Sequence, residues 1–108
     1  MGEYIQVLTT TGNKEDAVKI ARTLVQKKLA ACIQVGGPIT SIYRWEERIQ
    51  EDEEWRIVIK TRRDMYESLE KAIKENHPYE VPEIIGMPLT LGSGGYLEWM
   101  DEELALIN

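Results

Sequence analysis

Cysteine and histidine are almost absent from this 108-residue chain, which has one of each, Cys32 and His77. A single cysteine excludes an internal disulfide bond and fits a reducing compartment. With one thiol and one imidazole, the chain also lacks the C-x-x-C and H-x-x-x-H spacings of tight metal sites. The sequence therefore argues against a disulfide-stabilised fold and against a tight metal site within one chain.

Long apolar runs and an excess of positive charge are also missing. No segment approaches the roughly 18 consecutive apolar residues of a membrane-spanning helix, and a strand-like pattern follows Met1 directly. Thirteen basic residues against 19 acidic ones give a net charge of −6, which repels nucleic-acid phosphates. We therefore expect a cytoplasmic soluble protein that binds neither nucleic acid nor membrane.

The order of the predicted elements indicates an α+β fold with an antiparallel sheet. The segments are a strand (4–10), a helix capped by Asn13 (13–28), two strands (29–45 and 55–61), a helix (64–76), a strand (83–91) and a last helix opened by Ser93 (93–106). This βαββαβ order with a helical tail is the split arrangement of ferredoxin-like folds. No linker or repeat interrupts it, so we expect a single domain over residues 1–108.

The two central strands are predicted to form a hairpin with arms longer than the usual strand of about five residues. Gly36, Gly37 and Pro38 interrupt its first arm and suggest a bulge or bend. The hairpin aromatics exceed what one small core can cover, and exposed aromatics usually mark an interface. We expect Trp45 and Trp55 to lose most of their exposure when subunits assemble. The acidic runs 46–47 and 51–54 are interpreted as a solvated hairpin tip.

The segment 77–88, HPYEVPEIIGMP, is the strongest candidate for a site. Pro78 and Pro82 force the residues before them out of helical geometry, which places His77 at a helix end. The polar side chains between the prolines are then held in a stiff loop at low entropic cost. A simple helix-to-strand connector, with proline as the stop signal, remains the alternative.

Four motifs along the chain resemble the CutA family of divalent-cation-tolerance proteins: LAACIQ from Leu29, SIYRWE from Ser41, HPYEVPEII from His77 and YLEW from Tyr96. The resemblance covers essentially the whole chain. It implies a ferredoxin-like subunit that assembles as a homotrimer, similar in architecture to PII-type signalling proteins, and an association with copper and metal responses. The family usually carries glycine where this chain has Glu47, which weighs against a tight turn with positive φ there.

The candidate metal ligands are Cys32, His77, Glu80 and Glu83. Copper favours a thiolate and an imidazole, and carboxylates can complete such a shell. A lone cysteine in an apolar strand is nevertheless more often a small buried hydrophobe, and His77 could instead cap the last carbonyls of its helix. A weak or intersubunit site for a divalent cation such as copper remains, with no cofactor required.

A second candidate site is a cleft between subunits lined by Tyr43, Trp45, Lys60 and Tyr79. By resemblance to PII-type trimers, this cleft would accept a small anionic molecule near Lys60. A trimer that only scaffolds a partner protein is a further alternative. No spacing demands a nucleophile with a base, so we expect no enzyme activity. The leading hypothesis is a homotrimeric protein of divalent-cation tolerance that binds metal ions weakly.

Overall fold

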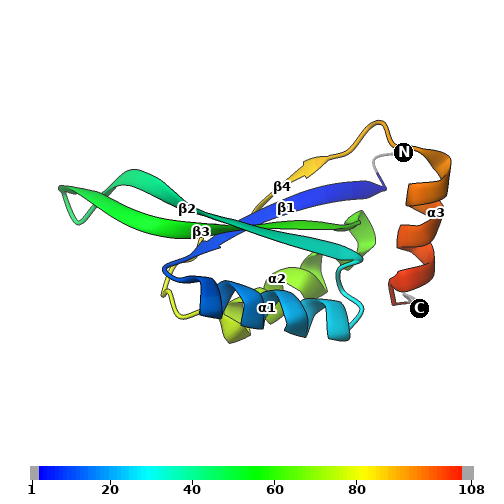
Figure 1. The fold of residues 1–108 in the computed structure, drawn as a ribbon, viewed down its shortest axis with the longest axis horizontal. Helices are drawn as coiled ribbons and strands as arrows, with labels where there is room; N and C mark the ends of the chain where they lie inside the picture. Colours follow the sequence, from blue (N-terminus) through cyan, green and yellow to red (C-terminus); the bar gives the residue numbers. More distant parts are fainter. Residues whose placement is uncertain (1–2, 106–108) are drawn as a thin grey trace.

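The computed structural model describes residues 3–105 as a four-stranded antiparallel sheet with three α-helices (Figure 1). The elements are β1 (Tyr4–Thr11), α1 (Lys14–Gln26), β2 (Cys32–Trp45), β3 (Arg48–Arg62), a 3-10 turn η1 (Arg63–Met65), α2 (Tyr66–Asn76), β4 (Ile85–Pro88) and α3 (Gly94–Glu103). The strand order is β2-β3-β1-β4, and every neighbouring pair is antiparallel. This confirms the predicted ferredoxin-like fold with its long hairpin and C-terminal helix.

Helices α1 and α2 lie on the same side of the sheet (Figure 1). Every second residue of a strand points to that side, and these residues are apolar or small, so the helices can pack on them. Val7 stands opposite Ile59 and Thr9 opposite Ile57, so their buried side chains form rows across the strands. The main core cluster contains Ile5, Val7, Ala17, Ile20, Leu24, Ala30, Ile57, Ile59, Leu69, Ala72 and Ile73.

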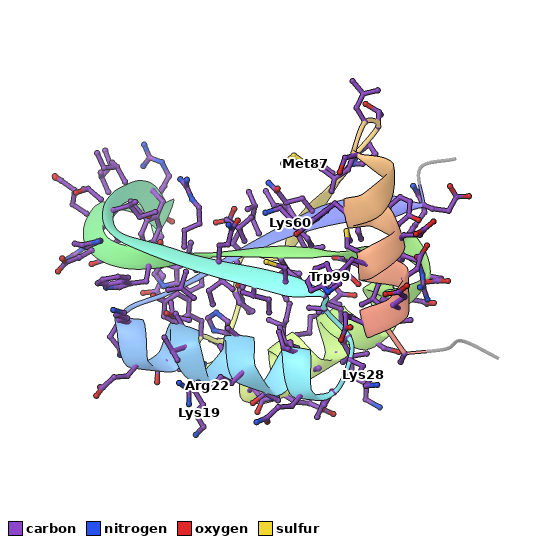
Figure 2. All side chains as sticks on the ribbon, turned by 45° about the vertical axis from the view of Figure 1, so that its right-hand side comes forward. Lys19, Arg22, Lys28, Lys60, Met87 and Trp99 are labelled. Carbon is purple, nitrogen blue, oxygen red and sulfur yellow. The ribbon has the colours of Figure 1, made fainter. Side chains whose placement is uncertain are left out.

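The sheet face away from α1 and α2, here called the open face, carries a different mixture of side chains. The register places Gln6, Lys60 and Met87 in one row across β1, β3 and β4. Figure 2 shows Lys60 and Met87 on the side of the sheet away from α1. Met87 is exposed, as is Ile85 in the next row. Apolar side chains therefore remain uncovered on the open face of one subunit.

The hairpin of β2 and β3 extends beyond the helices (Figure 1), and its register shifts between Gly36 and Ile39, which confirms the predicted bulge. Trp45 is exposed near the hairpin tip. Trp55, in contrast, stands opposite Thr11 and is already partly buried against the core. Part of the burial of Trp55 therefore comes from its own subunit, because β3 still pairs with β1 at this position, and the loss of its remaining exposure on assembly stays a prediction.

Several boundaries differ from the sequence-based prediction. The second strand begins at Cys32 instead of residue 29, and the third begins at Arg48 instead of residue 55, because the acidic residues of the hairpin still pair with β2. The second helix begins at Tyr66 after the 3-10 turn, and Asp64 forms an ion pair with Arg62 at 3.1 Å instead of capping the helix. The last strand pairs only over residues 85–88. An extended loop after Pro82 precedes it, and it ends at Pro88, which has no N–H to donate to a neighbouring strand. The last helix ends at Glu103, and residues 106–108 lie outside the described range.

The Ser93 cap is confirmed, since its hydroxyl accepts a hydrogen bond from the backbone N–H of Tyr96. Between residues 3 and 105 no helix is both long and apolar enough to cross a membrane.

The hairpin turn corrects one expectation. Glu46 and Glu47 form a two-residue turn between β2 and β3, with φ of 50° and 66°. Left-handed backbone is strained for residues with a Cβ, which is why Glu47 weighed against a turn with positive φ here. The turn nevertheless adopts this geometry with two glutamates, because the pairing of Trp45 with Arg48 leaves only two residues to reverse the chain.

We predict that Glu47→Gly stabilises the hairpin. Glycine relieves the left-handed strain of about 1–2 kcal/mol but loses more chain entropy, so the net gain should be about 0.5–1 kcal/mol. Glu53→Gly is the matched control, because Glu53 lies in regular β3 backbone opposite Thr40 and its replacement should destabilise the protein. Guanidinium unfolding measures both. Equal destabilisation by both substitutions would contradict the strained turn.

Candidate functional site

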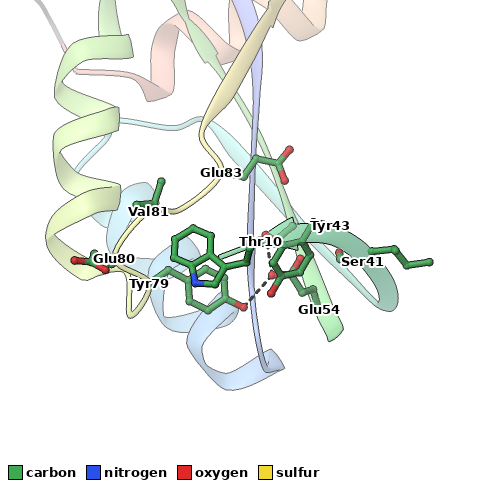
Figure 3. A pocket seen from close by; sticks show the side chains of 10 residues that line it. Thr10, Ser41, Tyr43, Glu54, Tyr79, Glu80, Val81 and Glu83 are labelled. Carbon is green, nitrogen blue, oxygen red and sulfur yellow. Dashed lines mark hydrogen bonds between the residues drawn. The ribbon is translucent and has the colours of Figure 1, made fainter. Parts of the chain in front are cut away.

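A groove of about 590 Å³ lies between the outer hairpin and the loop that joins α2 to β4 (Figure 3). It is lined by Thr10, Ser41, Ile42, Tyr43, Trp45, Glu54, Tyr79, Glu80, Val81 and Glu83. These residues come from the end of β1, from both arms of the hairpin and from the loop. The fold thus brings together three of the four predicted cleft residues, namely Tyr43, Trp45 and Tyr79.

Glu54 is the buried carboxylate of the groove, with 8% of its surface exposed. Its Oε2 accepts hydrogen bonds from the Tyr79 hydroxyl at 2.9 Å and from Thr10 Oγ1 at 3.2 Å (Figure 3). Burial, followed by this hydrogen bond to Glu54, raises the pKa of Tyr79 well above its usual value. The phenol therefore stays a donor, and Glu54 connects the loop to β1 and β3.

Sequence reasoning missed Glu54, because it closes an acidic run that was assigned to a solvated tip. The signal that could have found it is its place directly before Trp55, where the partly buried section of β3 begins. Alternation puts Glu54 on the same face as Arg56 and Val58, away from the helices. Only the loop that folds over this position makes it buried, and that contact is not readable from the sequence.

His77 is bound to backbone groups at both ring nitrogens. Nδ1 accepts the N–H of Tyr79 at 3.1 Å, so the ring proton is assigned to Nε2, which donates to the carbonyl of Thr10 at 2.7 Å. Burial lowers the pKa of His77, because the charged ring would lose solvation. His77 thus joins the loop to β1 rather than capping the carbonyls of its own helix.

The four candidate metal ligands are spread over two ends of the sheet. Glu80 and Glu83 line the groove and His77 lies beside it, whereas Cys32 stands opposite Lys60 at the start of β2. Thr10, which lines the groove, stands opposite Arg56 on β3. Lys60 lies four residues further along β3 than Arg56, a separation of about 13 Å. Within residues 3–105, no three His, Cys, Asp or Glu side chains lie close enough to hold a metal ion. A site shared between subunits stays a prediction.

Lys60, the fourth predicted cleft residue, does not line the groove. Its Nζ donates to Gln34 Oε1 at 2.6 Å on the open face, in the same row as Cys32 (Figure 2). Among the described lining residues there is no lysine, arginine or histidine. One subunit therefore does not place Lys60 with Tyr43 and Tyr79, and its role in a cleft between subunits stays a prediction.

We predict that His77 makes the protein less stable as the pH falls. In the unfolded chain histidine takes up a proton near pH 6.5, whereas the folded pKa is lower, so the unfolded state binds more protons between these two values. The stabilisation is complete above about pH 6.5 and is lost as the pH falls toward the folded pKa. Protonation of Nδ1 would also remove the acceptor of the Tyr79 N–H.

Guanidinium midpoints at several pH values between 7.5 and 5, measured in EDTA, test this prediction. The wild type should lose more stability over this range than His77→Gln, because carboxylate titrations are common to both proteins. Parallel curves for the two proteins would show that His77 has the same pKa in both states.

Comparison with known proteins agrees with this fold and extends it. The family model described as CutA1 divalent ion tolerance protein matches residues 5–103. The chain is 45% identical over 96 residues to a chloroplastic CutA protein of Arabidopsis thaliana, covering 89% of this chain and 53% of that protein. It thus spans about half the length of this plant relative. The crystal structure of CutA1 from Oryza sativa has a TM-score of 0.93 and 38% identity, covering 95% of this chain and 94% of that one.

The relatives correct the expected cytoplasmic location. The Arabidopsis protein is named chloroplastic, and a similar structure from Archaeoglobus fulgidus is described as a periplasmic divalent cation tolerance protein. That structure is 33% identical with a TM-score of 0.90, and covers 93% of this chain and 97% of its own. The cytoplasmic assignment is therefore wrong, because a low cysteine count indicates only that disulfide bonds are absent and does not determine the cellular location. The family assignment is independent of location: the chain belongs to the CutA1 divalent ion tolerance proteins.

Proposed function

We propose that this protein acts in divalent-cation tolerance, copper included, as a homotrimer that binds metal ions weakly and catalyses no reaction. The family supports the role in cation tolerance. The observation that carries the assembly is the open face of the sheet, where Ile85 and Met87 remain exposed. The edge strand β2, 14 residues long, adds backbone groups that a neighbouring subunit can pair.

Closed assembly supplies what a single subunit lacks. A ring of subunits covers apolar side chains and leaves no free edge to propagate. It also offers a way to bring Cys32 of one subunit near carboxylates of another, since one chain holds them at opposite ends of the sheet. Weak metal binding follows, because ligands on different subunits need the assembly to meet and Glu80 and Glu83 are solvated.

We predict a mass near three times 12.5 kDa in sedimentation at micromolar concentration. Met87→Glu should lower this mass toward that of one subunit, because it puts a charge into the contact that we assign to the open face. Val25→Glu is the control, since Val25 on α1 is as exposed as Met87, at 42%, but lies on the helical side. A well-folded monomer in the wild type, or equal effects of both variants, would contradict the assembly.

We predict measurable but weak binding of Cu(II), and weaker binding of Zn(II) and Ca(II), in calorimetry on demetallated protein. Cys32→Ala should weaken copper binding about tenfold or more, and Glu80→Ala with Glu83→Ala should weaken it as well. These substitutions leave the hydrogen bonds of His77 intact. Glu67→Ala, an exposed position on α2, is the control. Binding weaker than millimolar for all three ions, or copper binding that none of the ligand variants changes, would refute the ligand assignment.

The groove supports a second candidate function, that of a small-molecule sensor. Its volume of about 590 Å³ is in the range of small-molecule sites, and its aromatic side chains offer contact area. The anionic ligand that the PII resemblance implies would need a cation. Lys60, the cation proposed for that role, is bound to Gln34 outside the groove.

A further inference from the structure

The groove combines aromatic side chains with carboxylates and, among its described lining residues, contains no basic side chain. In a single subunit, Tyr43, Trp45 and Tyr79 are each about 40% exposed, so their rings are accessible to a ligand there. Positive charge over aromatic rings is attracted by their quadrupoles, and alkylated ammonium groups are bound in this way by aromatic cages. We propose that this groove binds a small organic cation, an alkylated ammonium with apolar substituents, at Glu54.

Glu54 is a buried carboxylate that a bound cation would stabilise. Its carboxylate is more than nine-tenths buried, yet both of its hydrogen bonds come from neutral hydroxyl groups, those of Thr10 and Tyr79. In the described part of the chain it forms no ion pair. Buried charges are usually paired, because an isolated one costs much solvation energy. Both hydroxyls bond to Oε2, which leaves Oε1 for a ligand.

The apolar part of the lining decides between an organic cation and a metal ion. Ile42 and Val81 line the groove beside the aromatic rings and are more than 60% exposed. A divalent cation needs several oxygen, nitrogen or sulfur ligands, and residues 3–105 hold no group of three that could bind one. Alkyl substituents, in contrast, gain contact with these side chains. The groove is also far larger than one ammonium ion requires.

The rings of both tyrosines are held in place before any ligand arrives. The Tyr43 hydroxyl donates to Asp52, and the Tyr79 hydroxyl donates to Glu54. His77 in addition accepts the backbone N–H of Tyr79 and stacks at a tilt on its ring, with centroids 4.8 Å apart. Figure 3 shows the Tyr79 hydroxyl directed toward Glu54. Binding therefore costs little side-chain entropy, which favours affinity for a small ligand.

Calorimetry on the 108-residue chain with choline chloride tests the proposal. The reference ligand is 3,3-dimethyl-1-butanol, which has the same shape as choline but carbon in place of the charged nitrogen. Choline should bind at least about tenfold more tightly, since charge attraction to Glu54 and the rings is lost in the alcohol. Equal affinities for the two compounds would overturn the proposal. Absence of choline binding would overturn it as well, and this is the result expected if a second copy of the chain fills the groove.

Matched variants assign the binding to the groove. Glu54→Gln should weaken choline binding at least about tenfold, whereas Glu51→Gln makes the same charge change at an exposed hairpin position that does not line the groove. Trp45→Leu alters an exposed side chain and keeps the test valid if Glu54→Gln fails to fold. Affinities unchanged by Glu54→Gln, or by Trp45→Leu, would refute the site. Working in EDTA separates this result from metal binding, so either proposal can fail alone.

Discussion

The one-sided cover of the sheet is the constraint on which the rest of this structure depends. Both long helices pack on the face where Val7, Ile57 and Ile59 are fully buried, and burial of such side chains stabilises the fold by about 1.5–3 kcal/mol each. The other face has no helix along its length (Figure 1). It can therefore carry a mixture such as Lys60 beside Met87, which a closed core would not tolerate.

A second consequence concerns the loop between α2 and β4. This loop leaves the helical layer and must cross to the edge of the sheet without regular secondary structure. Two polar contacts fix it there: His77 donates to the carbonyl of Thr10, and Tyr79 donates to Glu54. Thr10 donates to the same carboxylate and so ties β1 to β3 at this point. The hydrogen bonds replace the apolar packing that a helix would supply, so the groove is held by polar side chains and stays accessible. The residues that hold the loop in place are thus the same ones that line the proposed ligand site.

The elements of the fold were predictable from the sequence, because each depends on local patterns. Asn13 and Ser93 cap their helices as expected, and Gly36 precedes the bulge. The position of the turn at Glu46 and Glu47 was expected, but its left-handed backbone was not predictable, since strand pairing imposes it and the two residues do not favour it. Local sequence patterns therefore fail to predict the conformation at positions where contacts with distant segments determine it.

The candidate site was predictable only in part for the same reason. Tyr43, Trp45 and Tyr79 were expected to line a cleft between subunits, and the structure brings them together in a groove of one subunit. Lys60 was placed with them because it lies on the same hairpin, but the register sets it too far along β3. Glu54 was overlooked, since its burial depends on a loop that is 25 residues away in the sequence. The sequence therefore predicted which residues share one strand, but it did not predict the contacts between β1, β3 and the loop that bury Glu54.

Charge explains why the two cation sites proposed for this protein need not compete. The net charge of −6 attracts any cation to the surface, but the local surroundings select among them. At the groove, a buried carboxylate between aromatic rings suits a weakly hydrated organic ion, because a metal ion would keep its water shell there. At the opposite end of the sheet, Cys32 offers the soft ligand that copper prefers and that an ammonium group cannot use. Glu54 lies six residues along β3 from Lys60, the partner of Cys32, so one subunit keeps these chemistries about 20 Å apart. Assembly is then the only step that can bring thiolate and carboxylate together, so copper binding should depend on the oligomer while binding in the groove should depend on Glu54.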